Sequence, residues 1–91
     1  MKIKYSPMPD ITKPATIIKA LSNYSIEVDG DDFTFDPLDG EWENIEKQTD
    51  GVIVEARLEN DELYVTVRRY YDGITHPDWD DGEYHTMEIE A

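Results

Sequence analysis

Residues 76–85 hold the side chains from which a divalent-metal site could be built. The run HPDWDDGEYH places four carboxylates between His76 and His85, and imidazole and carboxylate groups are ligands for zinc or manganese. A site of this kind would use His76, Asp78 and His85. The run has no pair of histidines four residues apart on a helix, however, and its proline and glycine mark a loop. We therefore expect a solvated loop in which Trp79 packs on the sheet, without a metal or other cofactor.

A second acidic stretch, DGDDFTFDPLDGEWENIE at residues 29–46, carries eight carboxylates and no basic side chain. A calcium loop needs acids at positions 1, 3 and 5 and a glycine at position 6. Here Gly30 stands at the second position and Phe33 at the fifth, so the spacing does not fit the calcium template. Gly30 stands where a hairpin turn needs it, and we interpret the stretch as a hairpin followed by a short helix.

Nucleophilic and acid–base catalysis find little support in the sequence. The three serines all lie within the first 25 residues, and no nucleophile-elbow or phosphate-loop pattern surrounds them. Carboxylates are abundant, but a general acid needs an apolar setting that raises its pKa, and nearly all of these acids stand in polar runs. The sequence therefore predicts a protein that is not an enzyme.

The charge of the chain is strongly negative and unevenly placed. With 22 acidic and 8 basic residues the net charge is −14. Residues 1–26 carry four Lys and one Asp (+3), and residues 27–91 carry four bases and 21 acids (−17). Because phosphate contacts need a basic patch, direct binding of nucleic acid or of an anionic membrane is not expected. A field of this sign attracts a basic partner.

The same acidity allows an alternative function, imitation of a nucleic acid. Alternate residues on one face of a strand lie roughly 6.6 Å apart, which is comparable to the spacing of backbone phosphates. Glu27 with Asp29, and Glu88 with Glu90, could form such rows. A protein of this kind would inhibit a nucleic-acid-binding protein by occupying its basic groove.

The length and composition indicate one small β-rich domain spanning residues 1–91. A chain of this size buries roughly 60–65% of its unfolded surface, which suffices for one core. There is no cysteine, and no apolar run is long enough for a membrane span or a signal peptide. A cytoplasmic, soluble protein is the expectation.

Turn dipeptides and alternating patterns predict the strands. All five glycines follow an aspartate, and Asp-Gly favours hairpin turns. Residues 52–59 and 63–71 alternate apolar with polar side chains on either side of residues 60–62, which predicts a hairpin with one buried face. Residues 24–28 and 33–35, on either side of Asp29-Gly30, predict a second hairpin.

The rest of the chain gives weaker patterns. We expect strands at residues 2–5, 16–21 and 84–90, an extended loop at 6–14 because of its prolines, and a short helix around residues 41–47. The fold class is thus mainly β, an antiparallel meander that forms a curled sheet or small open barrel, with one short helix. The predicted core consists of Ile26, Val28, Phe33, Phe35, Trp42, Val52, Val54, Leu58, Leu63, Val65 and Val67.

The run IEVDGDDFTFDPL at residues 26–38 resembles a recurring segment of small uncharacterised proteins of tailed phages and prophages. In those proteins an apolar hairpin with Asn/Asp-Gly precedes an aromatic pair and a leucine. The start Met1-Lys2-Ile3 and the Asp50-Gly51-Val52 strand opening fall in similar order. The resemblance implies a gene near tail modules and an accessory role in the virion or in host takeover. It implies no catalytic or binding residue.

These observations favour an interaction or assembly module that binds another protein. Exposed tyrosine, tryptophan and arginine are typical of interface cores. The predicted partner-binding residues are Tyr64, Arg68, Tyr70, Tyr71 and Trp79. An open sheet would also leave edges free for a second copy, which allows a homodimer.

Overall fold

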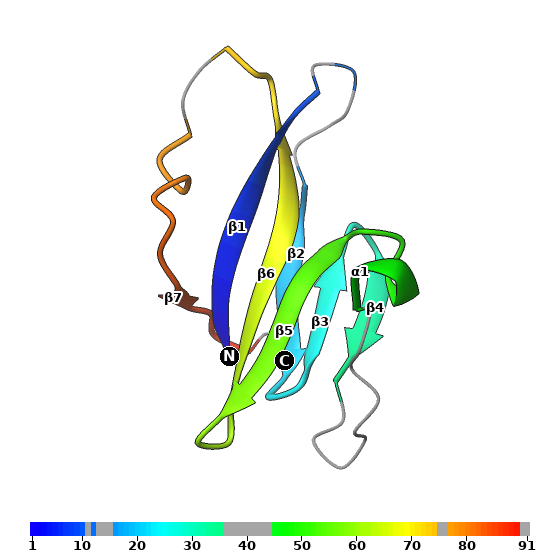
Figure 1. Ribbon diagram of the computed structural model, residues 1–91, viewed down its shortest axis with the longest axis vertical. Helices are drawn as coiled ribbons and strands as arrows, with labels where there is room; N and C mark the ends of the chain where they lie inside the picture. The colour runs from blue at the N-terminus through cyan, green and yellow to red at the C-terminus, as the bar shows by residue number, and fades with distance from the viewer. Residues whose placement is uncertain (11, 13–15, 36–44, 75–76, 90–91) are drawn as a thin grey trace.

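Figure 1 shows a computed structural model of the 91-residue chain, which describes residues 1–10, 12, 16–35, 45–74 and 77–89. Within these ranges the chain is mainly β with one short helix, as the sequence predicts. The strands are β1 (Lys2–Pro9), β2 (Ile18–Ser22), β3 (Ser25–Val28), β4 (Asp31–Thr34), β5 (Ile53–Glu59), β6 (Glu62–Tyr71) and β7 (His85–Thr86), and the helix is α1 (Ile45–Gln48).

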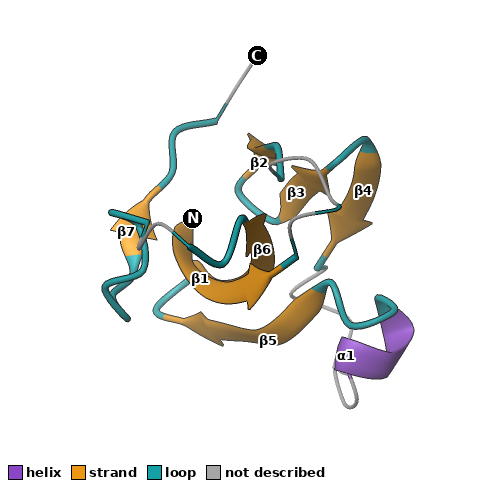
Figure 2. Cartoon of the chain, turned by 90° about the horizontal axis from the view of Figure 1, so that it is seen from above, coloured by secondary structure: helices purple, strands orange, loops and turns teal. Residues whose placement is uncertain are grey.

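The strands form two separate sheets that do not close into a barrel. Sheet A has the order β5-β6-β1-β7, and sheet B has the order β2-β3-β4. Sheet A lies in front of sheet B in Figure 1, and the view from above in Figure 2 shows sheet B on one side of β5 and β6. The buried core draws on both sheets, so the apolar faces of the two sheets cover each other.

The strand order departs from a simple meander at β1. β1 pairs with β6 in parallel, from Lys2 opposite Tyr64 to Pro9 opposite Tyr71, whereas the other strand pairs among the described residues are antiparallel. Alternation of apolar and polar residues indicates which face of a strand is buried, but it carries no information on strand direction. The central parallel pair therefore has no signature in the sequence.

β1 also continues to Pro9, so the loop predicted at residues 6–14 is wrong over residues 6–9. The amide of Asp10 donates to the carbonyl of Tyr71 on β6, at 2.9 Å. Since backbone groups alternate along a strand, even-numbered residues of β1 turn their amides toward β6 and odd-numbered ones turn away. Pro7 and Pro9 are odd-numbered, so their missing N–H groups cost β1 no bond to β6.

Both predicted hairpins are confirmed. β5 and β6 are joined by Asn60 and Asp61, with φ of 51° and 62°. β3 and β4 are joined by Asp29 and Gly30, with φ of 51° and 89°. Two successive residues at positive φ form the type I′ turn, whose twist matches that of the flanking strands.

The predicted core is largely confirmed, with one shift in β5. Six of the predicted residues are buried, and Met1, Ile3, Ala20 and Ile53 join them. Val52 is half-buried and packs against the core. The fully buried residue of this strand is Ile53, and Val54 is an extra residue in a bulge, between the pairs Ile53–Val67 and Glu55–Thr66. The bulge restores the inward position only from Ala56 onward. Leu58, at the far end of the strand, is 36% exposed, so its assignment to the core is wrong. Trp42 lies outside the described residues.

Helix α1 ends at the Asp50-Gly51 pair. The amide of Thr49 donates to the carbonyl of Ile45, and the amide of Gly51 donates to the carbonyl of Glu46. Gly51 has a φ of 79°, which is the left-handed conformation that commonly closes a helix. The predicted helix around residues 41–47 is therefore confirmed at its C-terminal end, and residues 41–44 lie outside the described residues.

The C-terminal segment connects the two sheets. β7 pairs only Thr86 and His85 with the first two residues of β1, so the strand predicted at 84–90 is shorter than expected. Ile89 then forms an isolated parallel bridge with Ala20 of β2. The strand predicted at residues 16–21 is confirmed as β2 and begins two residues later, at Ile18.

Candidate functional site

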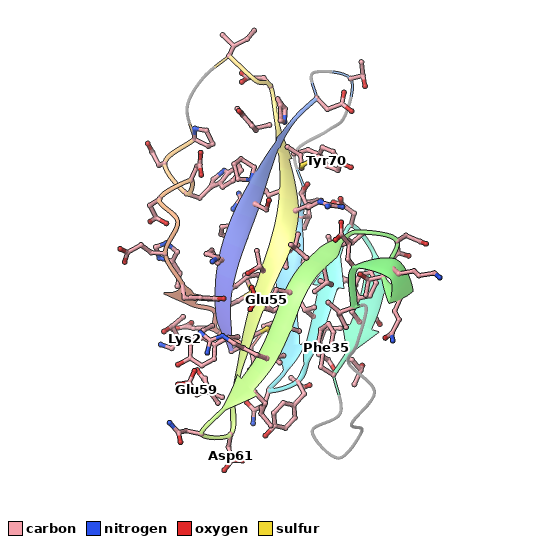
Figure 3. All side chains as sticks on the ribbon, in the orientation of Figure 1. Lys2, Phe35, Glu55, Glu59, Asp61 and Tyr70 are labelled. Carbon is pink, nitrogen blue, oxygen red and sulfur yellow. The ribbon has the colours of Figure 1, made fainter. Side chains whose placement is uncertain are left out.

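The side of sheet A that is turned away from sheet B carries one row of residues across three strands. Tyr64 on β6 lies opposite Lys2 on β1 and Arg57 on β5. Neighbouring residues along a strand alternate between faces, so this row lies on the side opposite to the buried residues Ile3 and Val65. We call this side the outer face. It faces the viewer in Figure 3, where Lys2, Glu55 and Glu59 are labelled.

Four side chains on the outer face form a cationic–aromatic cluster, made of Lys4, Arg57, Tyr64 and Tyr84. The rings of Tyr64 and Tyr84 meet edge to face, with centroids 5.3 Å apart at 89°. The guanidinium carbon of Arg57 lies 4.4 Å from the centroid of Tyr64 and 5.5 Å from that of Tyr84. The ammonium of Lys4 lies 4.9 Å from the Tyr84 centroid. Each ring thus has a cation over it.

Arg57 is held in place within this cluster. It forms an ion pair with Glu59, two residues along the same strand. Hydrogen bonds to Glu59 and to Tyr84 raise the pKa of Arg57. An aromatic pair flanked by an arginine and a lysine has the composition of an interface hot spot.

Trp79 belongs to a different cluster. Its ring lies 5.6 Å from the ring of Tyr5 and 6.1 Å from that of Tyr71, in edge-to-face contact with both. The guanidinium of Arg69 lies 4.8 Å from the Trp79 centroid and 4.7 Å from that of Tyr5. Trp79 is half-buried. This arrangement is the packing on the sheet expected for Trp79, and it also occupies Tyr71.

Arg68 and Tyr70, the other two predicted partner-binding residues, tie elements together at the far end of β6. Arg68 donates to the carbonyl of Gly51 at 2.6 Å and forms an ion pair with Glu46, which anchors α1 to β6. The amide of Tyr70 donates to the hydroxyl of Thr16 at 3.0 Å. Both residues line a cavity of about 110 Å³ at this end of the molecule.

The candidate metal ligands do not form a site among the described residues. Asp78 is exposed, and His76 lies outside the described part of the chain. His85 Nε2 lies 2.8 Å from a carboxylate oxygen of Asp81. The amide of Glu83, together with His85, lowers the pKa of Asp81. In the described ranges no group of three or more His, Asp or Glu side chains is placed to hold a metal ion.

The acidic rows take a different form from the one expected. Asp29 lies in the turn after β3, and its carboxylate accepts from the amide of Ile17 at 2.8 Å. It therefore caps the backbone of the neighbouring segment and does not continue a row with Glu27. Glu27 lies between two cross-strand partners, Asp32 in the β3–β4 ladder and Lys19 in the β2–β3 ladder. Glu88 is exposed, and Glu90 lies outside the described residues.

Of the four residues in the cationic–aromatic cluster, the sequence analysis predicted only Tyr64 as a partner-binding residue. Arg57 could have been found from one feature of the sequence, its place on the polar face of an alternating strand. Lys4 and Tyr84 have none, because Lys4 reaches the cluster through the parallel β1–β6 pair and Tyr84 through a segment without regular structure.

Comparisons with known proteins add no relative. No protein-family model, curated protein or solved structure matches the chain. The described part of the chain has no helix with the length and apolar content needed to cross a membrane.

Proposed function

We propose that this protein is a non-enzymatic interaction module that binds another protein through the outer face of sheet A. The observation that carries the proposal is the cationic–aromatic cluster, in which Tyr64 and Tyr84 are held edge to face under Arg57 and Lys4. Tyrosine and arginine are enriched in the residues that dominate binding energy. Sheet B covers the other side of sheet A, so the outer face is the side that a partner can reach.

The charge of the chain supplies the second part of the proposal. At −14 the protein attracts a basic partner over a distance of about one Debye length, roughly 8–10 Å in physiological salt. The cluster supplies the short-range contacts. We do not expect direct binding of nucleic acid, because the chain as a whole repels phosphate.

Two further elements of the proposal concern catalysis and origin. Two of the three serines have structural roles, since Ser22 accepts from the amide of Tyr24 and Ser25 is bonded to Thr34. This supports a non-enzymatic role.

An origin in a tailed phage, with a role in the virion or in the host cytoplasm, rests on the resemblance of residues 26–38.

A second candidate function is an acidic inhibitor that imitates nucleic acid. It is favoured by Glu27 and Asp32, which lie directly opposite each other on neighbouring strands. Like charges in this position repel each other, and Lys19, opposite Glu27 on β2, offsets part of this repulsion. An acidic pair that the sheet tolerates in this way is consistent with a binding role. The target would be a nucleic-acid-binding protein with a basic groove.

One pull-down from host lysate distinguishes the two functions. The bait is the wild-type chain, a Tyr64→Ala/Tyr84→Ala variant of the outer face, or a Glu27→Gln/Asp32→Asn variant of sheet B, each at low and high ionic strength. For the leading function, a captured protein is lost with the tyrosine variant alone and is largely retained at high salt. For the inhibitor, it is lost with the sheet B variant alone and released by salt. Equal capture by all three baits refutes both.

A further inference from the structure

Among the described residues β5 is the terminal strand of sheet A, and the backbone groups on its open edge pair with no other strand. Residues of an antiparallel pair alternate between pairs that exchange both backbone hydrogen bonds and pairs that exchange none. A two-residue turn closes on an exchanging pair, which here is Glu59 with Glu62. Counting back, Arg57 and Glu55 turn their backbone groups toward β6, and Leu58 and Ala56 turn theirs to the open edge.

A groove runs along this edge. It is lined by Val54, Glu55 and Ala56 of β5 and by Ile45, Glu46 and Lys47 of α1. Val54 is the extra residue of the bulge, and Glu55 and Ala56 beyond it point to opposite faces. A groove that both Glu55 and Ala56 line therefore follows the edge of the strand. Among the described residues, no strand lies between α1 and β5.

The residues of this edge are self-complementary. We infer that β5 pairs with β5 of a second copy of this chain, antiparallel and with a two-fold axis at Ala56. In this register Glu55 lies opposite Arg57 of the partner subunit, and Arg57 lies opposite the partner's Glu55. Ala56 meets the partner's Ala56 in an exchanging pair, and Val54 lies beside the partner's Leu58. The two sheets A become one continuous sheet.

Charge selects this register over its neighbours. An axis at Arg57 would place Arg57 opposite the partner's Arg57 and Glu55 opposite the partner's Glu59, which are like-charge pairs. An axis at Leu58 would place Ala56 opposite the partner's Asn60, inside the turn, where the strand has ended. This axis also pairs Arg57 with the partner's Glu59, but it sets Glu55 opposite the partner's Asp61 in the turn, which is a like-charge pair. Of the three registers, only the axis at Ala56 gives attractive charged pairs and keeps Ala56 paired within the strand.

Two features of the edge bear on this pairing. Charged residues and bulges commonly protect an edge strand from non-specific pairing. The bulge at Val54 limits the regular pairing to a short stretch around Ala56, and the charges penalise other registers, so both restrict the edge to one partner.

Arg57 already pairs with Glu59, but a guanidinium has five N–H donors and can bind a second carboxylate. Leu58, 36% exposed in the single chain, is covered in the dimer.

This inference does not depend on the proposed function, although the two are compatible. The outer faces of both copies would lie on the same side of the continuous sheet, so each dimer would present two cationic–aromatic clusters. Failure of the dimer leaves the pull-down result unaffected, and failure of the pull-down leaves the dimer unaffected.

Disulfide cross-linking tests the position of the axis. The chain has no cysteine, so a single introduced cysteine reports without background. Across the axis the two Ala56 Cα atoms would lie about 5.5 Å apart, within the range of a disulfide. The two Leu58 Cα atoms would lie about 13 Å apart, beyond that range. Under mild oxidation Ala56→Cys should form a covalent dimer and Leu58→Cys should remain single. Equal yields from the two variants, including none from either, would overturn the inference.

Charge exchange tests the register by a second route, using sedimentation velocity at increasing protein concentration. Glu55→Arg and Arg57→Glu each turn two attractive pairs into repulsive ones and should weaken dimerisation about tenfold or more. The double variant Glu55→Arg/Arg57→Glu restores both pairs and should dimerise like the wild type. An equimolar mixture of the two single variants should form a mixed dimer. If the mixture sediments as two monomers, or if the single variants match the wild type, the proposed pairing is wrong.

Discussion

Two buried threonines allow the same substitution to be made with opposite expected results. Thr49 and Thr66 are 8% and 6% exposed. The hydroxyl of Thr49 donates to the carbonyl of Ile45 at 2.8 Å and accepts from the amide of Ile53 at 3.2 Å. The hydroxyl of Thr66 has no hydrogen-bond partner among the described residues. Valine has nearly the same shape as threonine and carries a methyl group in place of the hydroxyl.

The magnitudes follow from these contacts. Thr49→Val leaves the Ile53 amide buried without its partner, which costs about 1–3 kcal/mol. In a domain of this size that lowers the Tm by about 4–8 °C for each kcal/mol. Thr66→Val removes a buried hydroxyl that forms no bond, and valine also has the higher strand propensity. Its free energy of unfolding should therefore stay unchanged or rise by about 1 kcal/mol.

Urea unfolding of the two variants beside the wild type provides the assay. Equal slopes of free energy against urea would show that the midpoints report stability alone. We expect the two variants to differ by about 1–4 kcal/mol, with Thr49→Val the less stable. If both shift in the same direction by similar amounts, the assignment of the bonded and the unbonded hydroxyl is wrong.

Three further substitutions, at Trp79, Gly51 and Asp81, have expected effects on stability. Trp79→Ala should cost about 2 kcal/mol through its lost ring contacts, and an unchanged urea midpoint would contradict the packing described. Gly51→Ala should lower the Tm more than Gly30→Ala. Both glycines have a positive φ, but an added Cβ would collide with the side chain of Arg68 at Gly51 and would meet no atom at Gly30. Asp81, whose pKa is lowered mainly by the Glu83 amide, stabilises the fold above its ordinary pKa of 3.8, and that stability is lost as the pH falls below it. The urea midpoints of Asp81→Asn and wild type should therefore converge in acid, and a constant gap from neutral to acid pH would contradict this.

Local features of the fold were accessible from the sequence. The hairpin at Asp29-Gly30 and the one at Asn60-Asp61 were predictable because a turn and its two strands lie within a few residues of one another. The end of α1 was accessible in part, since Asp50-Gly51 marks a turn but does not reveal that it closes a helix. Period-two alternation likewise identified most buried residues of β3 and β6.

Features that depend on distant contacts were not accessible. The parallel pairing of β1 joins residues about sixty positions apart, and nothing in either segment encodes it. The bulge at Val54 reverses the buried face within one strand, and a run of alternating residues cannot show where such a shift falls. The cationic–aromatic cluster requires both the parallel pair and the placement of Tyr84. For this reason only Tyr64 among its members was predicted.

The parallel pair of β1 and β6 also has a kinetic consequence. Lys2 meets Tyr64, and a loop of that length must close before the pair forms. The two hairpins close short loops and should form first, while β1 docks last, which makes docking of β1 the slow step of folding. Until β1 has docked, the backbone groups of Val65 and Val67 on that edge of β6 can pair with another chain. Refolding yield should therefore fall as protein concentration rises, even though the native sheet has no free edge at β6.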